Sequence, residues 1–103
     1  MKIIWAEEAF SAWKDTIDYI VQEFGPHAAE KFYKKTEECQ DMLISSPLMG
    51  KVEPLLKGRS HAYRSLIVQK RSKLVYYTQG DTIFIVDFWD VRREPKQQAE
   101  RLT

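Results

Sequence analysis

The period of the hydrophobic residues changes along the chain, and this change limits the fold more than any other feature. Apolar residues recur at helical spacing up to Ser45, whereas from Tyr63 to Trp89 they follow a period of two. The first pattern predicts amphipathic helices, and the second predicts strands of a partly buried sheet. The sequence therefore predicts an α+β domain in which helices precede most of the sheet.

Two long helices are predicted in the first half, after a short apolar strand at Lys2 to Trp5. The first helix runs from about Ala6 to Phe24. Its apolar stripe has six members: Phe10, Trp13, Ile17, Ile20, Val21 and Phe24. Gly25-Pro26 ends it, since glycine caps a helix C-terminus and proline suits the first turn of the next helix. The second helix runs from about Pro26 to Ser45, and its stripe has five members: Ala29, Phe32, Thr36, Cys39 and Leu43. So short a connection predicts an antiparallel helical hairpin.

Three strands are predicted in the second half, at Tyr63 to Gln69, Lys73 to Thr78 and Thr82 to Trp89. They are rich in β-branched and aromatic residues, and short polar turns separate them. We therefore expect an antiparallel meander, packed against the helical hairpin and joined by the N-terminal strand. Leu48 to Gly58 contains the Gly and Pro of an irregular loop. The tail after Pro95 is expected to form one helical turn or to stay loose.

Length and composition indicate one domain over residues 1–103. No apolar stretch is long enough to span a membrane. Acidic residues stand where a signal peptide would continue its apolar segment, so we expect a cytoplasmic protein. The lone cysteine, Cys39, cannot form an internal disulfide and is expected to be a small residue of the helical core.

The charges are segregated, although the net charge of the chain is only +1. Residues 1–50 carry five basic and nine acidic residues, while residues 51–73 carry seven basic residues and one acid, Glu53. The acids of the helices fall mostly between the apolar stripes and are expected to be solvated. A concentrated basic segment indicates a surface that binds a polyanion. Besides Arg64 and Lys73, five residues are predicted to bind RNA or another target: Lys51, Lys57, Arg59, Lys70 and Arg71.

Familiar catalytic motifs are absent from the sequence. It contains no Gly-rich phosphate loop, no HExxH, no GxSxG and no clustered Cys and His residues, so we expect neither a metal site nor a cofactor. His27 falls in the first turn of a helix, where it is expected to be solvated. His61 lies in the basic segment and is a candidate proton carrier. Trp5, Trp13 and Trp89 lie on apolar faces and are predicted to be core residues.

Four basic residues are the candidates for an anion-binding cleft: Arg64, Lys73, Arg92 and Arg93. In a meander the start of one strand lies beside the end of the next, which places Lys73 near Arg92-Arg93 at one end of the sheet. Arg64 lies near the start of its strand and is expected to be farther away. A cleft lined by such groups could hold a phosphate backbone, stabilise charge on a reacting phosphate or bind an acidic peptide.

The chain resembles the RelE/ParE superfamily of type II toxins in the order and spacing of its motifs. The N-terminal strand leads into the first helix, and the second helix ends in LISSPLMG (43–50). YRSLIVQKRSKLVYY (63–77) and WDVRREP (89–95) follow. This resemblance implies a toxin that is paired with a cognate antitoxin. It also implies one of two activities, which are ribosome-dependent cleavage of messenger RNA and non-enzymatic poisoning of DNA gyrase.

If the protein is a nuclease, the resemblance implies that Arg64, Lys73 and either Arg92 or Arg93 hold the scissile phosphate. The sequence departs from the nucleases at Leu66, where they place a second lysine, and lacks their C-terminal tyrosine. Three hypotheses follow, which are an mRNA endoribonuclease with His61 as proton carrier, a gyrase poison of the kind associated with plasmid stabilization, and a member that only binds its antitoxin. The antitoxin is predicted to bring acidic and apolar residues to the basic cleft by adding a helix or strand. The assembly is expected to be a homodimer or a toxin–antitoxin hetero-oligomer.

Overall fold

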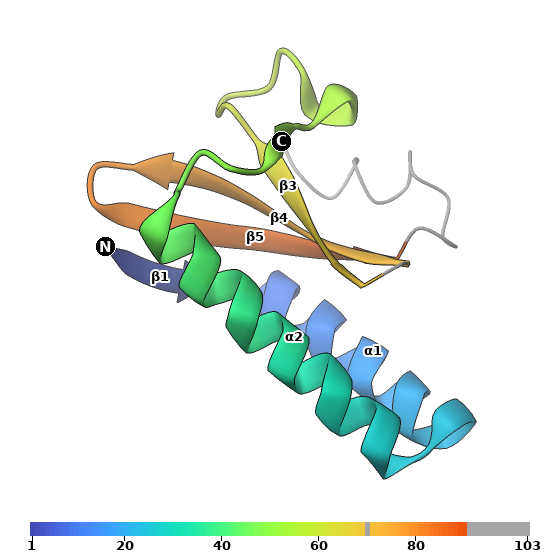
Figure 1. Ribbon diagram of the computed structural model, residues 1–103. Helices are drawn as coiled ribbons and strands as arrows, with labels where there is room; N and C mark the ends of the chain where they lie inside the picture. The colour runs from blue at the N-terminus through green and yellow to red at the C-terminus, as the bar shows by residue number, and fades with distance from the viewer. Residues whose placement is uncertain (70, 91–103) are drawn as a thin grey trace.

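The computed structural model describes residues 1–69 and 71–90, which form two helices, a short 3₁₀ turn and five strands (Figure 1). In chain order they are β1 (Lys2–Trp5), α1 (Glu7–Phe24), α2 (Pro26–Ser45), β2 (Lys51–Val52), η1 (Pro54–Leu56), β3 (Arg64–Gln69), β4 (Ser72–Gln79) and β5 (Thr82–Asp90). The predicted α+β class is confirmed, and every predicted helix and strand is present with bounds shifted by at most one residue. The predicted tail, with Arg92 and Arg93, lies outside the described residues, as does Lys70.

The strands form one sheet in the order β1-β5-β4-β3-β2. The predicted meander of β3, β4 and β5 is antiparallel, and β1 joins the sheet parallel to β5, with Ile3 opposite Ile83. The prediction of an irregular loop at Leu48 to Gly58 is wrong in one respect. Lys51 and Val52 form the edge strand β2, which pairs antiparallel with Ser65 and Arg64 of β3.

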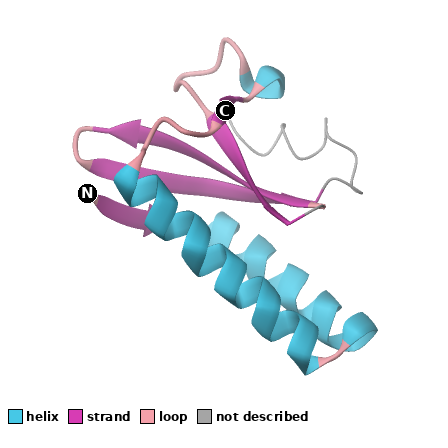
Figure 2. Cartoon of the chain, in the orientation of Figure 1, coloured by secondary structure: helices cyan, strands magenta, loops and turns pink. Residues whose placement is uncertain are grey.

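The helical hairpin lies on one face of this sheet and gives the domain two layers (Figure 2). Gly25 makes the sharp turn between the helices with a φ of 92°, a conformation that glycine adopts without a steric penalty. Pro26 follows at the first turn of α2, where its missing N–H costs no helical hydrogen bond. The predicted antiparallel hairpin is therefore confirmed, together with the reason for its break.

The core between the layers differs from the predicted stripe of α1. Ala9, Ala12 and Thr16 are the buried residues of this helix, whereas Phe24 is 67% exposed. Phe10 and Val21 are exposed as well, while Trp13, Ile17 and Ile20 pack partly against the core. Small side chains let the axis of α1 approach β5 closely, which turns the large aromatic residues to the edges of the contact. The predicted stripe of α2 is confirmed, because all five of its members are buried.

A second, smaller core covers the opposite face of the sheet. It consists of Leu56 from η1, Tyr63 just before β3, Val75 from β4 and Trp89 from β5, with Tyr77 and Val86 packed against it. The segment between β2 and β3 therefore lies on the face away from the helices. The predicted burial of Trp89 is confirmed, whereas Trp5 and Trp13 are only partly buried.

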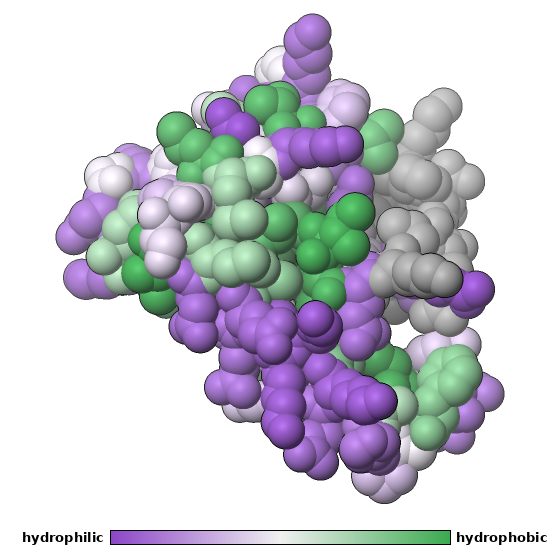
Figure 3. Space-filling view, in the orientation of Figure 1, coloured by the Kyte–Doolittle hydropathy of each residue, from purple (hydrophilic) through white to green (hydrophobic). Residues whose placement is uncertain are grey.

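The surface of the helices carries most of the acidic residues, as predicted, and each of the nine is exposed. Figure 3 shows hydrophilic side chains over the lower part of α2 and hydrophobic ones over its C-terminal end and the segment that follows. Exposed apolar residues of this region include Met42, Leu48, Met49 and Val52. No helix within residues 1–69 and 71–90 is long and apolar enough to cross a membrane.

Candidate functional site

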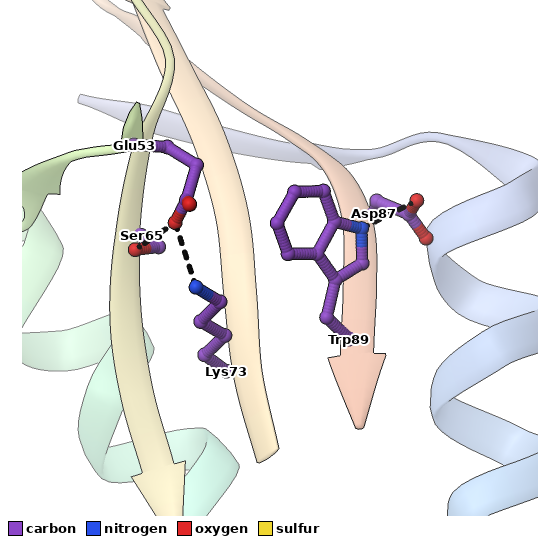
Figure 4. Close-up of polar contacts among 5 residues, drawn as sticks. All are labelled: Glu53, Ser65, Lys73, Asp87 and Trp89. Carbon is purple, nitrogen blue, oxygen red and sulfur yellow. Dashed lines mark hydrogen bonds and ion pairs between the residues drawn. The ribbon is translucent and has the colours of Figure 1, made fainter. Parts of the chain in front are cut away.

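A buried ion pair lies on the sheet face away from the helices. Oε2 of Glu53 accepts hydrogen bonds from Nζ of Lys73 and from Oγ of Ser65, each at 2.8 Å (Figure 4). The Glu53 side chain is 2% exposed and that of Lys73 is 22% exposed. The main-chain N–H of Glu53 also donates to Tyr63 O, which fixes the start of η1. The charge of Lys73 is therefore neutralised within the protein.

Trp89 and Asp87 of β5 complete this polar group. The indole Nε1 of Trp89 donates to Oδ2 of Asp87 at 2.8 Å, and the N–H of Phe88 donates to Oδ1 of the same carboxylate. Both Trp89 and Asp87 are 1% exposed. Nζ of Lys73 lies 5.0 Å from the centre of the Trp89 ring, within the range of a cation–π contact. Lys73 is thus held between a carboxylate and an aromatic face.

Arg64 lies on the other face of the sheet. It is paired in register with Tyr76, which belongs to the core under the helices. Its Nη1 donates to Gly50 O at 2.8 Å and to Leu48 O at 3.3 Å. Arg64 therefore holds the chain between α2 and β2 in place by binding two of its carbonyl groups.

Tyr76 also binds the segment between α2 and β2. Its hydroxyl donates to Pro47 O at 2.8 Å and accepts a hydrogen bond from the N–H of Gly50 at 2.9 Å. Burial raises the pKa of the Tyr76 hydroxyl, with the Gly50 hydrogen bond and the charge of Arg64 acting in the opposite direction. Gly50 fits here because a Cβ at its position would lie 2.7 Å from both the Tyr76 hydroxyl and Ser65 O.

The structure does not bring Arg64 and Lys73 together. Their side chains project from opposite faces of the sheet, and each is already bound to groups of this protein. Arg92 and Arg93, the other residues of the expected cleft, lie outside the described residues. Arg71 is exposed in the turn between β3 and β4, where it lines a hollow beside Ile20 and Phe24 of α1.

His61 lies in the segment between η1 and β3 and stacks on Tyr77. The two ring centres are 3.8 Å apart with an interplanar angle of 8°, and Tyr77 stacks in turn on Phe84 at 5.1 Å. Lys57, Arg59 and His61 line one hollow of about 320 Å³. Lys51 and Lys57 are exposed and Arg59 is partly buried, so the predicted target-binding residues of this segment reach its surface.

Sequence reasoning missed the two buried acids of this face. Glu53 is the single acid in a basic segment, and that isolation was a usable signal because such a residue has many potential ion-pair partners. Asp87 interrupts the apolar β5 strand, where a charged residue is rare unless it is hydrogen-bonded. Cys39 is buried as expected, and burial together with the nearby Glu38 carboxylate raises the pKa of its thiol.

Another hollow, of about 460 Å³, lies along the helical hairpin. Its walls include Trp5, Phe10, Trp13 and Tyr33. The indole N–H groups of Trp5 and Trp13 donate to Gln40 and Thr36, so these rings present apolar surface rather than free donors. Within residues 1–69 and 71–90, no group of three or more His, Cys, Asp or Glu side chains could hold a metal ion.

Comparison with known proteins places this fold in a family. The model of the ParE toxin of type II toxin–antitoxin systems, parDE, matches residues 3–95. No curated protein sequence gives a significant match. Several solved structures share the fold, among them the following three. The chromosomal ParDE toxin–antitoxin system from P. aeruginosa is 21% identical, with a TM-score of 0.70 over 88% of this chain and 96% of that one.

The other two structures cover this chain to a similar extent. The YoeB/ParE toxin from Agrobacterium tumefaciens is 18% identical, with a TM-score of 0.60 over 87% of this chain and 98% of that one. The YoeB dimer from Staphylococcus aureus is 23% identical, with a TM-score of 0.61 over 86% of this chain and 94% of that one. At these identities the likeness is one of fold.

Proposed function

The chain belongs to the ParE toxin family of type II toxin–antitoxin systems, and we propose that it stops growth by binding DNA gyrase rather than by cleaving messenger RNA. Membership of this family implies a cognate antitoxin as its partner. The choice between the two targets depends on how the basic residues of the candidate site are used.

The observation that carries the proposal is the internal engagement of Arg64 and Lys73. A nuclease needs cations that converge on the scissile phosphate and are free to stabilise its developing charge. Lys73 instead donates to Glu53 at 2.8 Å, and Arg64 donates to two main-chain carbonyl groups on the opposite face. These contacts make structural roles the best account of both residues. They support target binding without chemistry.

The first experiment is induction of the toxin without its antitoxin. Pulse-labelled protein synthesis, message integrity and DNA-damage induction are followed from the moment of induction. A gyrase poison leaves messages intact and induces the DNA-damage response before protein synthesis falls. An immediate stop in protein synthesis with cut messages would refute the gyrase proposal and favour the nuclease.

A variant that removes the charge of Lys73 sharpens this test. Glu53→Gln with Lys73→Met removes both charges of the ion pair and keeps a hydrogen-bond acceptor for Ser65. If Lys73 is structural, the double variant should remain as toxic as the parent at equal abundance. Loss of toxicity by a folded double variant would instead assign Lys73 a role in the activity.

For the antitoxin, the edge strand β2 offers a surface of the predicted chemistry. β2 is one of the two edge strands of the described sheet, with exposed Lys51 and with Val52 at 55% exposed. A strand with acidic and apolar residues could pair with this edge. Val52→Asp should weaken co-purification of the antitoxin, whereas Ile4→Asp on the opposite edge strand β1 is the matched control. Equal loss in both variants, or in neither, would contradict docking at β2.

A further inference from the structure

The stack of His61, Tyr77 and Phe84 has no role in the target binding proposed above. Tyr77 and Phe84 are paired in register on β4 and β5, and His61 adds a third ring from the segment between η1 and β3. Tyr63, which is 6% exposed, packs edge-on against both His61 and Tyr77 with ring centres 5.8 Å away. The rings are therefore held in place by the sheet and by a buried neighbour.

The outer end of this stack faces solvent. His61 is exposed although one face of its ring lies against Tyr77. A flat, exposed ring that is fixed on one face offers its other face as a stacking position for another planar π-system. Aromatic side chains in such positions bind nucleobases of any sequence, since every base has a π-face.

The surroundings of His61 supply positive charge. Lys57 and Arg59 line the same hollow of about 320 Å³, and Lys57 is exposed. The carboxylate of Glu53 also lines this hollow, but it is 2% exposed and neutralised by Lys73 at 2.8 Å. A phosphate next to a stacked base would therefore meet the exposed cation of Lys57 rather than an unpaired acid.

We propose that the segment between η1 and β3 binds single-stranded nucleic acid, with one base stacked on the face of His61 that points away from Tyr77 and the adjoining phosphate on Lys57. This inference goes beyond the proposed function, because it concerns the chain alone and requires neither gyrase nor cleavage. An acidic peptide would use the cations but would leave the ring face unused. The ring stack is thus the feature that favours a nucleic acid.

The test is fluorescence anisotropy of a labelled single-stranded oligodeoxyadenylate titrated with the purified full-length chain. His61→Ala should weaken binding by roughly five- to a hundredfold, the range for loss of one stacked base. His61→Phe should bind within about twofold of the parent, because it keeps a ring and loses only the imidazole nitrogens. His27→Ala is the matched control, since it removes an exposed histidine from α2 and should not change binding.

Charge and stacking are separated by two further measurements. Lys57→Gln should reduce the slope of log affinity against log salt concentration by about one, as expected for the loss of one phosphate contact. The same sequence as a duplex, whose base faces are hidden, should bind more weakly than the single strand. The ribose oligomer of the same sequence is titrated in the same way, and binding of either single strand supports the proposal. It is overturned if neither binds, if the duplex binds equally well, or if His61→Phe loses as much affinity as His61→Ala.

Discussion

Nζ of Lys73 lies 2.8 Å from Oε2 of Glu53, and this ion pair fastens the segment between β2 and β3 to the sheet. The pair joins residues that are 20 positions apart in the chain. Ser65 and the ring of Trp89 surround it and exclude much of the solvent. A contact of this kind turns a segment with little secondary structure into a fixed part of the domain, and the ring of His61 depends on that segment for its position.

Removing one partner of the pair should therefore destabilise the domain strongly. Lys73→Met leaves the Glu53 carboxylate buried without its counter-charge, and we expect the free energy of unfolding to fall by about 3 kcal/mol. The double variant Glu53→Gln with Lys73→Met should recover most of that loss. Urea unfolding followed by tryptophan fluorescence measures both. A single variant as stable as the parent would show that the pair contributes little to stability.

The buried hydroxyl of Tyr76 predicts a loss of stability at high pH. Burial raises the pKa of this hydroxyl above the usual value for tyrosine, about 10 in an unfolded chain. The folded state therefore holds the proton more tightly, so this contribution is complete below the unfolded pKa and is lost as the pH rises towards the folded one. Urea unfolding at a series of pH values should show a smaller alkaline decline in Tyr76→Phe than in the parent. Parallel declines would contradict this assignment.

The secondary structure could be predicted closely because local signals agree with the fold. Gly25-Pro26 gives the hairpin turn, and the period-two pattern gives β3, β4 and β5. β2 could not be predicted, because two residues carry no period. The packing face of α1 was also not predictable from hydrophobicity, since the contact with β5 selects small residues such as Ala9 over large ones such as Phe24.

The candidate site was less predictable than the fold, because it depends on tertiary contacts between residues far apart in the sequence. The sequence shows that Lys73 and Arg64 are basic, but not that each has a partner within the protein. Glu53 and Gly50 O, which bind them, lie more than ten residues away in a segment without regular pattern. The excess of basic residues in 51–73 thus overstated the positive surface, because Arg64 and Lys73 of this segment are bound within the protein.

Gly50 should not tolerate a larger residue. Its N–H bonds to Tyr76, and a Cβ would lie 2.7 Å from the Tyr76 hydroxyl and from Ser65 O. We expect Gly50→Ala to lower the free energy of unfolding by about 1 to 3 kcal/mol, as for other overpacked sites. Because Tyr76→Phe removes one of the clashing atoms, the effects of the two changes should be less than additive in a double-mutant cycle. Strict additivity would place the strain elsewhere.

The two helices of the hairpin should respond differently to the loss of a phenylalanine. Phe32 of α2 is 1% exposed and packs edge-on against Phe88 with ring centres 5.7 Å apart, whereas Phe24 of α1 is 67% exposed. Phe32→Ala leaves a cavity between the layers and should lower the free energy of unfolding by about 3 to 5 kcal/mol. Phe24→Ala should change it by less than about 0.5 kcal/mol, as is usual for surface positions. Chemical denaturation of the two variants under identical conditions provides the comparison, and a large loss in Phe24→Ala would mean that the hairpin tip is buried in solution.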